Sequence, residues 1–500
     1  MMRVLAHRFV MTAAATCLVA AAACAQWSFQ LDTSFRSVVV QRNVNAIHVL
    51  TDGGVFLSGL IRFAGDMSDR GSAKLLTDGS RDLTFPSFPQ TTGGGKIVPW
   101  LNGKFYVAAF QPRRMLANGL VDPSFGPIGI GPYFQSGTIG DYHVFPDGRV
   151  LISGSHTLSD AVRGFVGSYE LIWFTNTGYL DTTRTHRNAN GPIYEFKEML
   201  NGQFICTCNC SQYEGQPVSR VFRVNADGSL DTAFQSSITA GNIYEIEGLP
   251  DGRVLLGGNF RFSGAPQDTV RLARLLPDGQ RDAAFASPSF AGYGLWWPPS
   301  GTIVFDIFPF HGGTYIIAGQ FVAVNGQERK GLCMVDGDGA LLPAFDSCGT
   351  GPFTYQSTTN ATPLNVYWSP DSTAIYICGT YASYTDGTTT DPSQRFVSRL
   401  LVSELTTAVQ DPAAPSGKLF TLQPNPAQGS VTFVYNNPRM ASAQGSIVVR
   451  DLVGRVIISL PMNNQQGQQT WGLQAVSPGT YLVQYLAGGQ VLHTEKLLVQ

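Results

Sequence analysis

One short phrase recurs seven times in this chain of 500 residues, and it constrains the fold more than any other feature. Each copy is an apolar run that ends in two adjacent small positions, and the second of these is Gly in five copies. The copies are VFLSGLI (Val55–Ile61), FYVAAF (Phe105–Phe110), VLISGSH (Val150–His156), FICTCNC (Phe204–Cys210), VLLGGNF (Val254–Phe260), YIIAGQF (Tyr315–Phe321) and IYICGTY (Ile375–Tyr381). Self-similarity at a period of this length predicts a stacked or radial architecture.

A second phrase follows the first and predicts its hairpins. Its clearest copy is ARLLPDGQRDAAF (Ala273–Phe285), and AKLLTDGSRDLTF (Ala73–Phe85) matches it at the same positions. Asp-Gly between apolar runs is a strong hairpin signal, because both turn residues need positive φ. The Asp of each D-x-x-F step can bond its own backbone and turn the chain again. Each unit therefore has the size and the strand count of a four-stranded propeller blade.

Composition agrees with an all-β repeat protein. The sequence contains 55 Gly and 29 Pro, and charged residues are only 14%. We expect seven blades over residues 26–405, with the small positions where strands converge on a central axis. The seventh unit lacks a D-x-x-F step, and FQLDTSF (Phe29–Phe35) supplies one at the other end, so this N-terminal strand should close the ring. A β-solenoid is the alternative fold.

These residues resemble a known family. The combination xDGxxxxGGxF and RLxxDGxLDxxF is similar to the delta-60 repeat of large secreted bacterial proteins, which is generally taken to be propeller-like. The resemblance covers Phe29–Glu404 and is most specific at Asp251–Phe285. It implies a propeller and carries no established catalytic residues.

The N-terminal segment, 1–25, has the pattern of a secretory signal peptide. A basic stretch, Arg3 to Arg8, precedes the apolar run Phe9–Ala23, and Ala23-Cys24-Ala25 is a small-x-small cleavage site before Gln26. The competing interpretation makes Cys24 a lipoprotein cysteine, although Ala21 stands where Leu is usual. No later apolar run approaches the length of a membrane-spanning helix, and the net charge of −2 with no basic stripe argues against nucleic acid.

Cleavage would leave six cysteines in an oxidising compartment. Cys206, Cys208 and Cys210 alternate along one strand, where neighbours on a face are too far apart for an easy bridge, so we expect core fillers or pairs across strands rather than a zinc site. Cys333 and Cys348 are a plausible disulfide, and Cys378 has no assigned partner.

The C-terminal segment, 418–500, forms a separate module. Residues 406–417 have the composition of a linker, and alternation in 418–500 predicts a small β-sandwich. These residues closely resemble the C-terminal sorting domain of the type IX secretion system, through Pro424, Asn425, Pro426, Gly454, Gly479, Tyr481 and Lys496. The resemblance implies handling by the type IX machinery and secretion, by way of the periplasm, to the outer surface of a Gram-negative bacterium.

Catalytic motifs are missing from the sequence. We find no HExxH, GxSxG, P-loop or GxGxxG, and Asp336-Gly337-Asp338-Gly339 fits a turn better than a calcium loop. Glu195, Glu198, Glu245 and Glu247 could supply a carboxylate pair for glycan cleavage, although solvated or hydrogen-bonded rim residues explain them as well. We expect no cofactor and no metal.

Two function classes stay open. The first is a non-catalytic surface propeller that binds glycan or protein through loop aromatics, with Tyr293, Trp296 and Trp297 as candidate contacts. The second is a polysaccharide-acting hydrolase or lyase, which a cluster of two or three carboxylates or His at one mouth of the channel would favour. The repeats explain nearly every distinctive residue, so we prefer the first.

Overall fold

The computed structural model divides the chain into two compact units, on either side of residues 406–419. The structure describes residues 26–86, 95–108, 111–126, 128, 133–292, 301–356, 358–405, 420–436, 445–451, 456–462, 466–474, 476–487 and 490–500. The predicted signal peptide, the predicted linker and the loop residues Tyr293, Trp296 and Trp297 lie outside these ranges.

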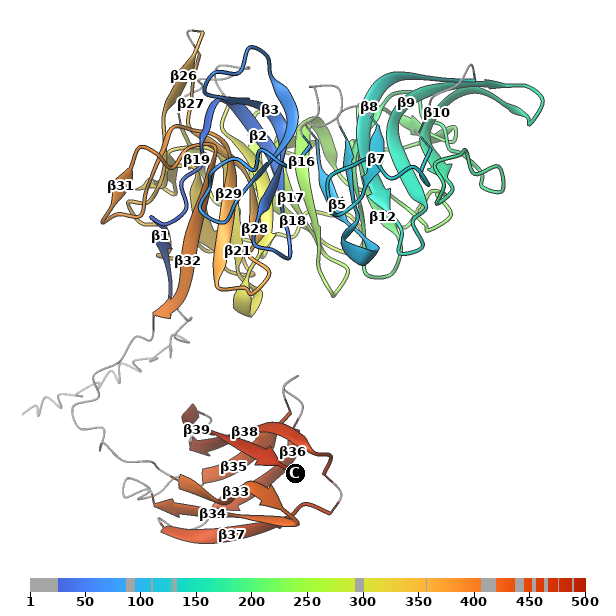
Figure 1. The fold of residues 1–500 in the computed structure, drawn as a ribbon. Coiled ribbons are helices and arrows are strands. Elements are labelled where there is room, and N and C mark those ends of the chain that lie inside the picture. The colour runs from blue at the N-terminus through green and yellow to red at the C-terminus, as the bar shows by residue number, and fades with distance from the viewer. Residues whose placement is uncertain are drawn as a thin grey trace, which may run out of the picture. The chain divides into compact units, whose positions relative to one another are not determined.

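Antiparallel sheets of three or four strands follow one another along the first unit (Figure 1). The described part of this unit contains seven main sheets. Six are built from strands that lie close together in the chain, and the seventh adds β1 to three strands from the end of the unit. Their strands are β2 (Val39–Val49), β3 (Val55–Phe63) and β4 (Arg70–Leu75); β5 (Ile97–Pro99), β6 (Phe105–Ala108) and β7 (Pro112–Met115); β8 (Phe134–Val144), β9 (Val150–Asp160) and β10 (Phe165–Phe174); β11 (Ile193–Glu198), β12 (Phe204–Cys208) and β15 (Val221–Val224); β16 (Ile238–Gly248), β17 (Val254–Phe262) and β18 (Val270–Leu275); β20 (Ile303–Pro309), β21 (Tyr315–Gln320) and β24 (Leu332–Val335); and β28 (Thr362–Trp368), β29 (Ala374–Thr380), β32 (Val397–Leu405) and β1 (Gln26–Leu31).

Smaller elements decorate these sheets. They are β13 (Gln212–Tyr213) with β14 (Gln216–Pro217); β19 (Phe290–Ala291) with β22 (Ala323–Val324) and β23 (Gln327–Glu328); β25 (Gly349–Gly351) with β30 (Ser383–Thr385) and β31 (Thr390–Asp391); β26 (Phe353–Tyr355) with β27 (Thr358–Asn360); and the 3-10 turns η2 (Leu101–Gly103) and η3 (His311–Gly313). In the described part of the chain no helix is long and apolar enough to cross a membrane.

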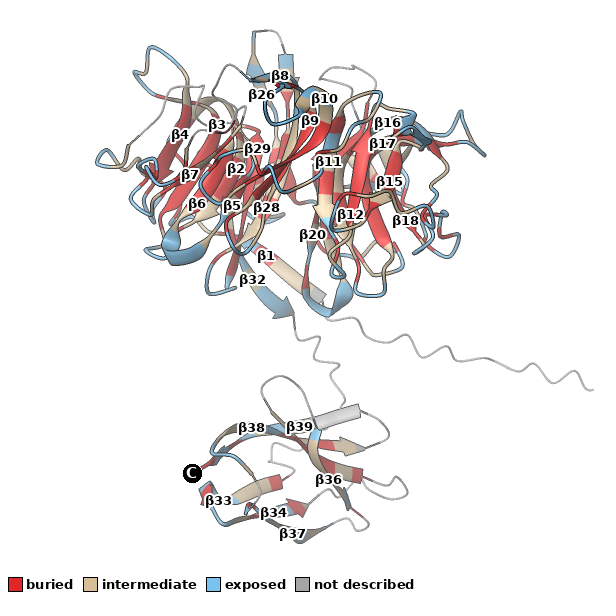
Figure 2. Cartoon of the chain, turned by 90° about the vertical axis from the view of Figure 1, so that its right-hand side faces the viewer, coloured by how far each residue is buried: buried red, intermediate tan, exposed pale blue. Residues whose placement is uncertain are grey.

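Buried residues run along the strands of the sheets (Figure 2), and apolar clusters join neighbouring sheets. One apolar cluster joins Leu255 of the fifth sheet to Ile317 of the sixth. Another joins Leu57 of the first sheet to Tyr376 of the seventh, so the last sheet packs on the first. A sheet that buries both faces against like neighbours in a closed series is a β-propeller blade. The propeller prediction is confirmed, and the solenoid alternative is wrong.

The N-terminal strand closes the ring as predicted. β1 pairs with β32 in antiparallel register, from Gln26 opposite Leu405 to Leu31 opposite Leu400. Phe29 and Leu31 of β1 are buried, and Phe29 stacks on Phe345, which follows the sixth sheet, with 4.3 Å between ring centroids. The outer strand of the last sheet is therefore supplied by the other end of the propeller sequence.

The glycine column of the first phrase has a different cause from the expected one. It lies on the second strand of the sheets, whereas the residues around the propeller axis come from the first strands or their entries. A Cβ on Gly59 would collide with the carbonyl oxygen of Asn43, and one on Gly258 with that of Asn242. The first strands carry a β-bulge at this level, between Val44 and Ala46 in the first sheet. Gly therefore makes room for a bulged neighbouring backbone and not for an axis.

The second phrase encodes a clasp, which we define as an Arg on the third strand with the Asp and Phe of the following D-x-x-F step. The Arg donates from Nε to the Asp carboxylate and covers the Phe ring. The Nε–O distances are 2.8 Å for Arg114–Asp122 and 2.7 Å for Arg223–Asp231, Arg274–Asp282 and Arg399–Asp32. The matching distances from the guanidinium carbon to the Phe ring centroid are 4.9 Å, 4.9 Å, 5.1 Å and 5.2 Å.

Each clasp also ties its sheet to the next. The Arg donates to a backbone carbonyl in the Asp-Gly or Asn-Thr-Gly turn of the following sheet, at Asn176, Pro277, Gly337 and Thr77 for Arg114, Arg223, Arg274 and Arg399. The Asp in turn accepts from backbone N–H groups of its own step, as Asp122 does from Ser124 N at 3.0 Å. That bond to its own backbone was expected from sequence, whereas the link between sheets was not.

Two expectations about cysteine are wrong. Cys208 and Cys210 form a disulfide with 5.2 Å between their Cα atoms. β12 ends at Cys208, so the chain bends at Asn209 and the strand spacing that argued against a bridge no longer applies. Cys333 and Cys348 are both free and lie in different apolar clusters. Cys206 and Cys378 are free and buried.

The second unit is a two-layered β-sandwich. Its strands are β33 (Phe420–Gln428), β34 (Ser430–Asn436), β35 (Gly445–Arg450), β36 (Val456–Met462), β37 (Gln466–Gly472), β38 (Gly479–Ala487) and β39 (Gln490–Val499). β33 pairs with β34 through its first residues and with β39 at Ala427, so it passes from one layer to the other at Pro424–Pro426. Apolar side chains from both layers fill one core, including Phe433 and Val483.

Three of the predicted sorting residues, Pro424, Asn425 and Pro426, lie where β33 changes layers. The Asn425 side chain bonds the backbone of β39 at two residues: its Nδ2 donates to Lys496 O at 2.6 Å, and its Oδ1 accepts from Leu498 N at 2.9 Å. Tyr481 donates from Oη to Ser477 O at 2.7 Å, and Gly479 begins β38. Pro424, Pro426 and Lys496 are exposed. Gly454 lies outside the described residues.

Candidate functional site: the axial channel

A cavity of about 740 Å³ lies on the axis of the propeller. Residues from the first strand, or its entry, of all seven sheets line it, and only a space on the axis can border every sheet. Each sheet contributes one residue, in its first strand or at the entry to it, that directly precedes a buried residue. We call these seven residues the axial ring. The axial ring is Ala46, Lys96, Asp141, Glu195, Glu245, Asp306 and Asn365.

Most charges of the axial ring are bonded between sheets. Lys96 Nζ lies 2.9 Å from Asp141 of the next sheet. Lys197, also in the channel wall, donates from Nζ to Glu245 at 2.9 Å and to Glu247 at 2.7 Å. These pairs cross the junctions between the second and third and between the fourth and fifth sheets, which gives the charges a structural role.

Single polar contacts cross three further junctions. Asp306 is 8% exposed, and its Oδ2 accepts from Val366 N at 2.7 Å, which joins the sixth sheet to the seventh. Asn365 Nδ2 donates to Asn45 O at 2.6 Å and joins the seventh sheet to the first. Glu198 lies 3.4 Å from Nε2 of His143 across the junction of the third and fourth sheets.

Glu195 differs from the other ring carboxylates. Among the described residues its carboxylate has neither a hydrogen bond nor an ion pair. Burial raises the pKa of Glu195 well above its ordinary value, and the charges of Asp141 and Glu245 raise it further, while Lys96 opposes them. The protonated form of Glu195, which can donate a hydrogen bond, is therefore favoured more than in an exposed glutamate.

Burial in the channel wall and the charges nearby also shift the pKa values of the neighbouring groups. Burial raises the pKa of Glu245, with Lys197 opposing, and burial followed by the charge of Glu245 raises the pKa of Asp306. Burial would lower the pKa of Lys96, but Asp141, Glu195 and Glu245 raise it above its usual value. Burial and then Lys96 lower the pKa of His143 to about 4, so its imidazole is neutral.

Aromatic side chains border the channel where the first strands bulge. Tyr244 and Phe305 are partly exposed, and their ring centroids lie 5.1 Å apart at 56°. Leu364 occupies the matching position in the seventh sheet, and Gly95 and Gly140 occupy it in the second and third. The fifth and sixth sheets therefore contribute aromatic side chains to the channel lining and the second and third contribute glycine, beside carboxylate, amide and ammonium groups.

Sequence reasoning named four glutamates of this region and missed the ring. Glu195, Glu198 and Glu245 line the channel, and Glu247 bonds Lys197 beside it, so the structure brings the predicted carboxylates together. A usable signal exists, because each ring residue of the first six sheets lies thirteen positions before the second small position of the first phrase, as Glu245 lies before Gly258. The predicted contacts Tyr293, Trp296 and Trp297 fall outside the described residues.

Comparison with known proteins agrees with both units. Residues 210–234 and 249–285 match the model of a domain of unknown function (DUF5122) that is a β-propeller. Residues 421–500 match the model of the secretion system C-terminal sorting domain. The chain is thus a β-propeller protein with a type IX sorting domain. Such a domain implies handling by the type IX machinery, and the protein is secreted to the outer cell surface.

Solved structures with similar chains were also found. A protein of unknown function from Bacteroides caccae is 13% identical, with 56% of this chain and 90% of that chain covered and a TM-score of 0.31. The β-propeller domain of Cps50 (Swd1) from Myceliophteria thermophila is 13% identical, with 76% and 100% covered and a TM-score of 0.25. Similarities at this level carry no argument about function. A search of curated proteins found no match.

Proposed function

We propose that this protein is a non-catalytic binding protein of the cell surface, and that it binds a saccharide at the mouth of the axial channel. The observation that carries the proposal is the pair Tyr244 and Phe305 at the edge of a polar-walled cavity of about 740 Å³. Aromatic faces pack against the apolar faces of sugar rings, while carboxylate and amide groups satisfy their hydroxyls. Asn45, Asn365 and Glu195 supply such groups.

The charge pattern favours binding over chemistry. Glycoside hydrolysis needs one carboxyl group that holds a proton and a second that acts as a base or nucleophile. The raised pKa of Glu195 favours the first role, but Asp141 and Glu245 on either side are held by lysines that also join the sheets. Neither is free to move toward a substrate without breaking a junction of the ring.

A glycan array with the secreted protein, followed by titration calorimetry on the best ligand, tests the proposal. Tyr244→Ala and Phe305→Ala should each weaken binding by about tenfold or more, since a buried aromatic contact contributes about 1.4 kcal/mol or more. Tyr179→Ala is the matched control, because Tyr179 is 73% exposed and lies outside the channel lining. Equal losses in all three variants, or no saccharide binding, would refute the proposal.

A polysaccharide hydrolase is the second candidate, favoured by the raised pKa of Glu195 alone. Release of reducing ends from a panel of polysaccharides measures it. We expect no turnover above background. Turnover that Glu195→Gln abolishes, with unchanged melting of the protein, would establish the enzyme and overturn the binding proposal.

A further inference from the structure

A second hollow lies beside the fourth sheet, and none of its lining residues belongs to the axial ring. Its volume is about 900 Å³. Its wall combines apolar side chains, such as Phe222 and Ile238, with amide and hydroxyl side chains, including Asn190, Asn209, Ser236 and Thr239. Arg220 and Asp231 are the charged residues of this wall.

Arg220 is an unneutralised cation. Its backbone is fixed on both sides, because its N–H donates to Ile238 O at 3.2 Å and its carbonyl accepts from Cys208 N at 3.0 Å. The Arg220 guanidinium has no ion pair or hydrogen bond with any residue that the structure describes. Asp231 cannot serve it, since its Oδ2 already accepts from Arg223 Nε at 2.7 Å and Gln203 Nε2 at 2.9 Å.

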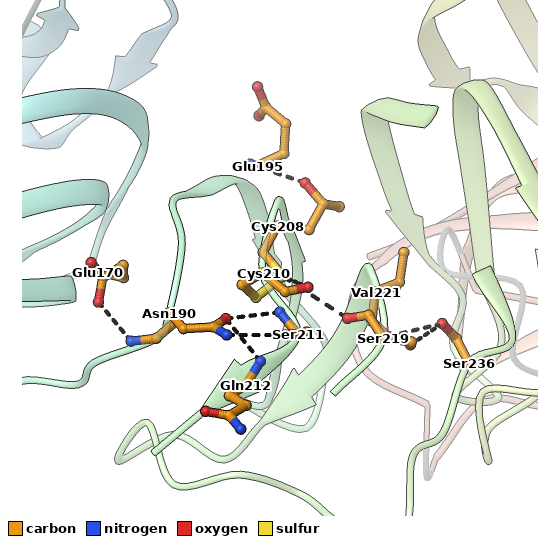
Figure 3. The surroundings of a disulfide bond; sticks show 12 residues. Glu170, Asn190, Glu195, Cys208, Cys210, Ser211, Gln212, Ser219, Val221 and Ser236 are labelled. Atoms are coloured by element: carbon orange, nitrogen blue, oxygen red, sulfur yellow. Dashed lines mark hydrogen bonds between the residues drawn. A yellow bond between two sulfur atoms is a disulfide. The ribbon is translucent and has the colours of Figure 1, made fainter. Parts of the chain in front are cut away.

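A disulfide and hydrogen bonds within the protein fix part of the wall of the hollow without a ligand (Figure 3). The Cys208–Cys210 disulfide fixes the bend after β12, and Cys210 itself borders the hollow. Asn190 Oδ1 accepts from Ser211 N at 2.8 Å and from Gln212 N at 3.0 Å, which fastens the following loop. A preformed wall lowers the ordering cost of binding.

The open edge of β15 is not a docking strand for a peptide. Val221 O, the acceptor that an added strand would use, already accepts from Ser219 Oγ at 2.8 Å and Ser236 Oγ at 2.9 Å (Figure 3). Strand addition depends on free main-chain groups along an edge. A hydroxyl-rich ligand with a negative group fits the amides, hydroxyls and free guanidinium better.

We propose that this hollow is a binding site for an acidic saccharide, in which Arg220 contacts the carboxylate or sulfate group and the amide and hydroxyl side chains contact the sugar hydroxyls. The linings of the hollow and of the channel share no residue, and this proposal does not rest on saccharide binding in the channel. Arg220 also borders a smaller cavity of about 260 Å³ that contains Glu195 and Tyr244. The raised pKa of Glu195 weakens the repulsion that this carboxyl group exerts on an anion there.

Calorimetry with the secreted full chain tests the site, using oligogalacturonate, a sulfated malto-oligosaccharide, uncharged maltotetraose and tetraglutamate as probes. We expect one or both acidic saccharides to bind and the uncharged one to bind at least tenfold more weakly. Arg220→Ala should weaken acidic-saccharide binding about 10- to 100-fold, and Arg220→Lys should weaken it less, because Lys keeps the charge without the planar fork. Arg113→Ala, which removes a charge from β7 outside the lining of both cavities, should change nothing.

The outcomes separate this site from the channel. Phe305→Ala should leave acidic-saccharide binding intact, because Phe305 borders only the channel. If uncharged sugars ignore Tyr244 and Phe305 while acidic ones depend on Arg220, the channel proposal fails and this one stands. Unchanged binding in a folded Arg220→Ala variant, no binding of either acidic probe, or tighter Arg220-dependent binding of tetraglutamate would each overturn the assignment.

Discussion

Removing one clasp arginine should destabilise the whole ring, and Arg274 offers the clearest test. Its side chain is 2% exposed, and it bonds Asp282 at 2.7 Å, covers Phe285 and reaches the Gly337 carbonyl of the next sheet. Arg274→Ala leaves the Asp282 carboxylate buried, with the Ala284 N–H at 2.9 Å and Arg253 Nη1 at 3.7 Å as its remaining partners among the described residues. Breaking a buried pair from one side costs about 3–5 kcal/mol, and we expect a loss of that size in the free energy of unfolding.

Urea unfolding, followed by tryptophan fluorescence, measures this loss. Arg149→Ala is the control, because the Arg149–Asp147 pair has the same 2.7 Å spacing but is exposed, and such pairs contribute about 1 kcal/mol or less. Arg274→Ala with Asp282→Ala should be less destabilised than the sum of the single variants, since the second change removes the stranded charge. Equal losses for Arg274→Ala and Arg149→Ala would show that the clasp does not hold the sheets together.

Further outcomes follow from the same geometry. Deleting 26–35 should remove β1 and expose β32 as an edge, which promotes aggregation in light scattering; a truncated protein that melts like the intact one contradicts ring closure through β1. Burial alone would raise the pKa of Asp122, but Lys104, Ser124 and Arg114 hold it below its ordinary value, so the stability that Asp122 contributes is present above about pH 4 and lost below it. Asp122→Asn should flatten this part of the stability–pH curve measured by urea unfolding. Glu195 has the opposite sign, since its folded pKa is raised: Glu195→Gln should stabilise the protein at pH 7 and not below about pH 4, and a loss of stability at pH 7 would contradict the buried-acid argument. Deleting 418–500 should leave a folded propeller in the periplasm, and normal surface levels of the truncated protein on fractionation would refute an export role for the second unit.

The repeat determined the fold class because its information is local. Asp-Gly turns and D-x-x-F steps fix where strands begin and reverse, and apolar alternation fixes which face is buried. The missing step after β32 and the extra one at Phe29–Phe35 even indicated which strand closes the ring. The Pro424–Pro426 step and the alternation after it likewise identified the C-terminal sandwich before its strands were known.

Tertiary structure decided what the sequence could not, because the relevant neighbours lie one repeat apart in the chain and meet only when the ring forms. Lys96 and Asp141, or Lys197 and Glu245, are unremarkable charges until the first strands of adjacent sheets come together. The glycine column gave a correct forecast of close backbone approach and a wrong cause, since the bulge belongs to the neighbouring strand. The Cys208–Cys210 disulfide was not predicted, because the argument used the distance between alternate residues of a continuous strand. β12 ends at Cys208, so that distance does not apply to Cys210.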